Sequence, residues 1–170
     1  MILPNYIIMR GAFMKTKTLF LKISLFLIGL PILALCIFFL PLIAKGAASE
    51  YPKLVYLPVI INAYLSALPF YFALYQAYRL LSYIDKNTAF SKVSVASLKY
   101  IKYCGAVISI LYAISMFSFY IIAERKDAPG IILIGLALTF APLIISVFAA
   151  VLQKLLENAI DMKEENDLTV

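Results

Sequence analysis

Four tyrosines recur at helical spacing in one apolar stretch and are the side chains best suited to hold a ligand. An aromatic face can bind an amphipathic or cationic molecule through its rings. The default use of such a stripe is packing against a neighbouring helix, with the hydroxyls hydrogen-bonded away from water and near Asn62 and Gln76. Separations of seven, four and three residues place the four on one helix face: Tyr64, Tyr71, Tyr75 and Tyr78.

The residue types needed for most catalytic and metal chemistry are missing or scattered. The chain has no His, and it carries no nucleophile, phosphate-binding or zinc motif. Cys36 and Cys104 fall at different depths of their apolar stretches, so neither a disulfide nor a metal site is expected. Ion-coupled transport needs a charged group within the membrane, and these stretches have none. The sequence therefore predicts no enzyme, no cofactor and no metal, and it disfavours a pump.

The elements that carry these residues are four charge-free stretches in a chain that is 64% hydrophobic. Crossing a hydrocarbon core of about 30 Å takes roughly 20 helical residues. Lipid offers no hydrogen-bond partners to the backbone, so the spans must be helices. The predicted fold is all-α, an integral membrane antiparallel four-helix bundle in one domain at 14–170. Its spans are expected near residues 19–44, 54–81, 97–123 and 128–156, with an acidic tail at 157–170.

Basic residues are distributed unequally between the two sides of the predicted membrane. The chain has 15 Lys and Arg against 9 Asp and Glu. Because a basic excess stays in the cytoplasm, both termini and the connection at 79–102 are predicted to be cytoplasmic. This multi-pass topology explains the net charge of +6 without direct nucleic-acid binding. The basic residues assigned to the opposite side are only Lys45, Lys53, Arg125 and Lys126.

Residues 1–13 differ from the rest and are predicted to be a poorly ordered extension or to lie on the membrane surface. A start at Met14 would place a basic segment directly before the first span, so Met1, Met9 and Met14 are alternative translation starts. The first charge-free stretch is too long for a signal peptide and lacks a cleavage site, so we expect it to be retained.

The cytoplasmic connection and the tail form the predicted working surface. The helical pattern breaks at residues 87–90, and either Ser91 or Ser94 can cap the helix that leads into the third span. Three lysines in a narrow arc of that helix can meet anionic headgroups or an acidic partner. The acidic tail is repelled by an anionic leaflet unless a basic surface holds it, either these lysines or a separate protein. The candidate partner-binding residues are Asp85, Asn87, Phe90, Ser91, Lys92, Lys99, Lys102, Glu164, Glu165 and Asp167.

Two regularities bear on helix packing. Gly105, Ser109 and Ala113 are spaced four apart, which predicts a close helix–helix contact, within the chain by default and in a homodimer as the alternative. Gln76 and Gln153 each precede a basic residue and a leucine pair. This likeness fits an ancient duplication or convergent interface chemistry equally well.

The cytoplasmic segments also resemble a known family. The resemblance rests on YIDKN at 83–87, AFS at 89–91, SLKYIK at 97–102 and EENDLTV at 164–170. Over essentially residues 14–170 the chain is similar to four-span bacterial membrane proteins catalogued as domain of unknown function 2975. That family implies no established activity, cofactor or catalytic residue. Its members are often encoded beside a small helix-turn-helix regulator, which the resemblance implies as a cytoplasmic partner.

Three functions are open on these grounds. The leading hypothesis is a non-enzymatic regulatory or scaffold protein of the bacterial cell membrane that tethers such a regulator in response to a membrane signal. The second is a small-molecule export or permeation component that uses the tyrosine face. The third is a membrane immunity protein. Membrane lipids are also expected partners.

Overall fold

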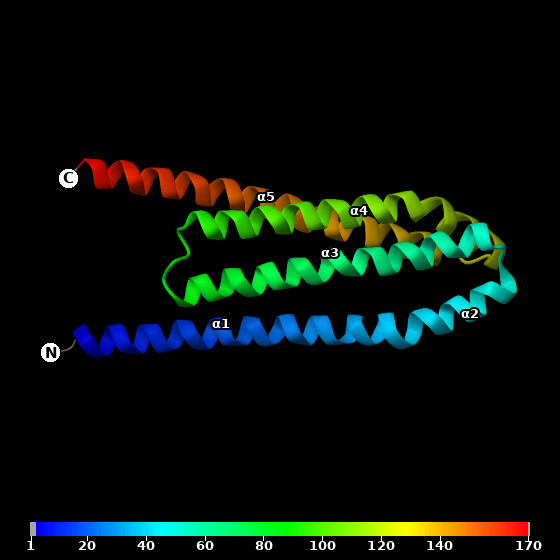
Figure 1. Cartoon of the computed structure of the whole chain (residues 1–170), viewed down its shortest axis with the longest axis horizontal. Coiled ribbons are helices and arrows are strands. Elements are labelled where there is room, and N and C mark those ends of the chain that lie inside the picture. The colour runs from blue at the N-terminus through cyan, green and yellow to red at the C-terminus, as the bar shows by residue number, and fades with distance from the viewer. Residues whose placement is uncertain (1–2, 170) are drawn as a thin grey trace.

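The computed structural model describes residues 3–169, and over this range the chain forms long antiparallel helices (Figure 1). Four of them are long and apolar enough to cross a membrane, counting the first three segments as one rod. This confirms the predicted all-α membrane bundle. The segments are α1 (Leu3–Ala34), the π-helical turn η1 (Leu35–Phe39), α2 (Leu40–Glu50), α3 (Lys53–Asp85), α4 (Lys92–Lys126) and α5 (Gly130–Leu168).

Both ends of the described chain lie at one end of the bundle, together with the α3–α4 connection at residues 86–91 (Figure 1). We call this the terminal end and the opposite one the distal end. Only short connections, residues 51–52 and 127–129, join the helices at the distal end. The terminal end therefore gathers the segments that the sequence marked as a working surface.

The α4 helix is the centre of the packing. It contacts α3 and α5, whereas α1 contacts α3 and, within the described range, neither α4 nor α5. Lipid gives helices no hydrophobic reason to associate, so such contacts depend on small residues and hydrogen bonds. Asn62 Nδ2 of α3 donates to the Leu111 carbonyl of α4 at 2.9 Å. Ser146 Oγ of α5 donates to the Lys102 carbonyl at 2.6 Å.

The N-terminal segment and the acidic C-terminal tail are both helical within the described residues. Residues 3–13, for which we expected poor order or a position on the membrane surface, form the first turns of α1, and the side chains of residues 4–13 are exposed. The acidic tail continues α5 as far as Leu168, because its residues include many good helix formers and no Gly or Pro. Met1, one of the alternative starts, and Val170 lie outside the described residues.

Candidate functional site

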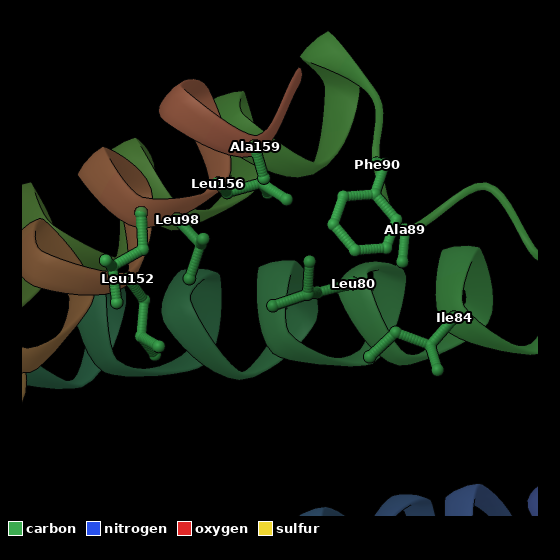
Figure 2. Close-up of a pocket in the computed structure, with 9 residues that line it drawn as sticks. Leu80, Ile84, Ala89, Phe90, Leu98, Leu152, Leu156 and Ala159 are labelled. Carbon is green, nitrogen blue, oxygen red and sulfur yellow. The ribbon is translucent and has the colours of Figure 1, made fainter. Parts of the chain in front are cut away.

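An apolar groove opens at the terminal end between α3 and α5, and α4 and the α3–α4 connection complete its lining (Figure 2). In the view of Figure 1, α5 runs obliquely across α4 and moves away from α3 toward this end, which leaves the space. The groove has a volume of about 330 Å³. We call it the terminal groove, and its main lining residues are Leu80 and Ile84 of α3, Phe90 of the connection, Leu98 of α4, and Leu152 and Leu156 of α5.

Two glutamines adjoin the groove, of which Gln76 is buried and Gln153 is partly buried. Gln76 lies one helical turn before Leu80, is 3% exposed, and has no hydrogen-bond partner for Oε1 among the described residues. Gln153 follows Leu152; its Nε2 donates to Glu157 at 2.9 Å, while its Oε1 also lacks a partner there. An unsatisfied buried polar group costs about 1–3 kcal/mol. The two similar segments of the sequence thus form the opposite walls of one groove, each with an unused acceptor.

Asp85, a predicted partner-binding residue, is engaged within the chain. Lys22 Nζ donates to Asp85 Oδ2 at 2.5 Å, and Thr18 Oγ1 donates to Oδ1. These hydrogen bonds, that of Lys22 first, hold the pKa of Asp85 below its ordinary value. Both donors belong to α1, so the contact fastens α1 to the end of α3. A partner that binds this carboxylate would therefore compete with α1 for it.

Of the two predicted caps, Ser91 and Ser94, the structure selects Ser91. Ser91 Oγ accepts a hydrogen bond from the Ser94 amide at 3.4 Å and begins α4. Asn87 follows α3 with a φ of 56°, a left-handed conformation that Asn adopts more readily than most residues. Phe90, at the groove, is 62% exposed. The connection therefore presents an aromatic side chain beside an apolar opening.

The structure does not bring the tail acids to the lysines of α4. Lys92 and Lys99 are exposed, and Lys102 lies with its ammonium 4.9 Å from the centre of the Tyr103 ring. None of the three forms an ion pair within residues 3–169. The predicted tail residues are exposed on the last turns of α5: Glu164, Glu165 and Asp167.

Comparison with known proteins agrees with the resemblance seen in the terminal-end segments. A family described as protein of unknown function (DUF2975) matches residues 42–170. The chain belongs to this family. It is 61% identical over 158 residues to the uncharacterized membrane protein YoaS of Bacillus subtilis (strain 168), covering 92% of this chain and 99% of that protein. No solved structure matches. The DUF2975 match includes the whole terminal groove and leaves out Thr18 and Lys22.

In this DUF2975 protein the tyrosine face packs largely against the first rod. Tyr71 Oη donates to the Gly29 carbonyl at 2.8 Å. The Tyr78 ring meets Phe26 edge-on, with 6.4 Å between ring centres. Tyr75 instead lies near Arg79 of its own helix. Tyr71 and Tyr78 thus pack against the first rod, whereas the use of this face by a ligand stays a prediction.

Tyr64 donates a hydrogen bond to a backbone carbonyl of the first rod that has no donor within its own helix. In the π-helical turn the Leu40 amide bonds to the Leu35 carbonyl. Pro41 has no N–H, so the Cys36 carbonyl lacks its helical donor. Tyr64 Oη donates to this carbonyl at 3.1 Å. Such a bond matters in lipid, where no water replaces it.

Removing this hydroxyl in Tyr64→Phe is expected to weaken the attachment of the first rod, at η1, to α3 by about 1 kcal/mol. Tyr71→Phe should have a smaller effect, because the Gly29 carbonyl keeps the amide four residues on as a helical donor. Thermal unfolding of the purified variants in one detergent measures both. Tyr120→Phe is the matched control, since Tyr120 is exposed and its hydroxyl forms no hydrogen bond within residues 3–169. Equal losses in all three variants would contradict the account of Cys36.

The small-residue stripe lies partly at a helix contact. A Cβ at Gly105 would lie 2.7 Å from the Pro142 carbonyl oxygen, and Ser109 Oγ donates to the Thr139 carbonyl at 2.8 Å. Ala113 is exposed. Each step of four residues turns about 40° around a helix, so the third member leaves the face that meets α5.

Proposed function

We propose that this protein is a non-enzymatic regulatory or scaffold protein of the bacterial cell membrane. At its terminal end it would hold a small helix-turn-helix regulator. The observation that best supports this role is the exposure of Glu164, Glu165 and Asp167 on a helix that continues from the last span. Acidic side chains held in fixed order on a helix suit a basic surface, such as that of a DNA-binding protein.

The proposed orientation places the terminal end in the cytoplasm. Lysines gather there, and the positive-inside rule assigns them to the cytoplasmic side. A soluble regulator would then meet the tail, the α3–α4 connection and the start of α1 on one face. The short distal connections leave no room for a receptor domain, so the signal would act within the membrane.

A tether that also releases its partner needs two states that the signal distinguishes. The α1 helix suits this role because it contacts α3 and, in the described chain, neither α4 nor α5. The Lys22–Asp85 contact holds α1 next to the connection. A membrane signal that displaces α1 would expose Asp85 to the partner, which links the spans to the cytoplasmic face.

Neutralising the tail acids tests the tether. In a triple variant carrying Glu164→Gln, Glu165→Gln and Asp167→Asn, we expect recovery of a co-expressed small helix-turn-helix regulator to fall about tenfold in co-purification, given up to about 1 kcal/mol for each exposed charge pair. Glu50→Gln and Glu124→Gln at the distal end form the matched control. Undiminished recovery with the triple variant would contradict this role for the tail.

A further inference from the structure

We infer that the terminal groove is a lipid site. It takes an acyl chain of an anionic phospholipid from the adjoining leaflet, and lysines at its rim hold the phosphate. This inference does not depend on the tether, and its test contains no protein partner.

The lining of the groove suits an acyl chain. Its volume of about 330 Å³ is within the range of small-molecule pockets. Leucines dominate the walls, and the part formed by α5 extends from Leu152 to Ala159, roughly 10 Å of helix. In Figure 2, the side chains of Leu80 and Phe90 lie on one side of the opening, and Leu156 and Ala159 on the other. An apolar opening of this kind is unfavourable in water, so an apolar occupant stabilises it.

The depth of the groove favours lipid over a soluble occupant. Each of the three helices that line the groove has a lining residue next to a basic residue in the sequence. That basic residue lies at the end of the charge-free stretch or a few residues beyond it. The pairs are Arg79 with Leu80, Leu98 with Lys99, and Lys154 with Leu155. Basic residues at span ends lie at the headgroup level. The bilayer itself is therefore the nearest source of an apolar chain, at a local concentration that no soluble protein reaches.

The charge at the rim favours an anionic headgroup. Lys86 and Lys92 border the connection that ends the groove, each two residues from a lining residue, Ile84 and Phe90. Both lysines are exposed, and neither forms an ion pair within the described chain. On the α5 wall the nearest carboxylate, Glu157, accepts a hydrogen bond from Gln153. The rim thus has unpaired positive charge where a phosphate would lie.

A single introduced tryptophan can report on the groove, because the chain contains no Trp. Phe90→Trp keeps an aromatic ring at the opening, and lipid chains that carry bromine quench tryptophan on contact. In reconstituted full-length protein, brominated phosphatidylglycerol should quench this reporter saturably and at low mole fraction. Two lysines near a phosphate predict a preference of about 10- to 30-fold over brominated phosphatidylcholine. Phe38→Trp, in the exposed face of η1, should be quenched equally by both lipids.

Two changes in the reporter background separate chain binding from headgroup binding. Ala159→Leu should fill the groove and abolish saturable quenching, whereas Ala137→Leu, an exposed alanine of the same helix, should leave it unchanged. Lys86→Gln with Lys92→Gln should remove the preference for phosphatidylglycerol, and Lys45→Gln with Lys53→Gln should keep it.

Either of two results would overturn the lipid site. Equal, unsaturable quenching by both lipids that Ala159→Leu leaves unchanged would mean ordinary bilayer contact. No quenching by either lipid would mean that chains do not enter, and that a side chain of a protein partner is the better occupant.

Discussion

Gly105→Leu is expected to force α4 and α5 apart and to lower the melting temperature of the purified protein by about 10 °C, from a loss of roughly 3 kcal/mol or more. A Cβ at this position would lie 2.7 Å from the Pro142 carbonyl oxygen and 3.1 Å from Ser146 Cβ. The first of these atoms is backbone, so no side-chain rotation relieves the clash. Separation would also break the bond from Ser146 Oγ to the Lys102 carbonyl.

Two controls isolate the close approach of the helices from the other properties of glycine. Gly46→Leu makes the same replacement where nothing lies within 4 Å of the added Cβ, so it should not destabilise the protein. Gly105→Ala should cause an intermediate loss, because it adds the clashing Cβ alone. An unchanged melting temperature in Gly105→Leu would show that α4 and α5 do not meet here in the membrane.

The spans follow from the sequence because the rule behind them is local. A charge-free stretch of sufficient length must become a helix in lipid, whatever it packs against. The contact at Gly105 was also predictable, since small residues four apart allow close approach. The helix that Gly105 meets was not predictable, because the sequence of one chain does not distinguish a contact with α5 from a contact with a second copy of the protein. Ala113 was included by spacing alone, although rotation around the helix carries it off the contact.

The terminal groove and the Lys22–Asp85 contact were not predicted, because both depend on how the helices lie relative to one another. The pattern of Leu152, Leu155, Leu156 and Ala159 marks an apolar face on the last helix, but not the divergence of α5 from α3 that leaves it open. In the sequence, Asp85 has the features of an exposed docking residue. Its contact with Lys22 becomes visible only once the position of α1 is known. The topology alone could have suggested the Lys22–Asp85 contact. Antiparallel spans place the start of the first span and the end of the second at the same depth in the membrane.

Asp85→Asn is expected to release the terminal end of α1 from α3. The charge-assisted bond from Lys22 contributes about 1.5–3 kcal/mol, so its loss should raise the detached population about tenfold or more. Spin labels at the exposed positions Ile23 and Val93, with Cys36 and Cys104 replaced by Ala, report the separation as a distance distribution. The distribution should broaden toward longer distances in Asp85→Asn.

The ion pair at the distal end is the matched control. Lys126 Nζ lies 3.0 Å from Glu50 Oε2, with both side chains about half exposed, so Glu50→Gln should leave the distribution unchanged. No broadening in Asp85→Asn would show that the tyrosines of α3 suffice to hold the first rod. An equal broadening in Glu50→Gln would show that the effect is not specific to the Lys22–Asp85 contact.

The pH dependence gives the Lys22–Asp85 contact a signature of its own. Because Lys22, Thr18 and the nearby Lys15 lower the pKa of Asp85, the folded state favours the carboxylate. The contact is therefore fully stabilising above the ordinary pKa of 3.8 and is lost as the pH falls below that value through the lowered one. The wild-type distribution should stay constant near neutral pH and broaden only in this acid range. The distance distribution of Asp85→Asn should be broad at every pH, since Asn has no carboxylate to protonate. If the wild-type distribution already broadens at mildly acidic pH, a different titratable group holds α1 to α3.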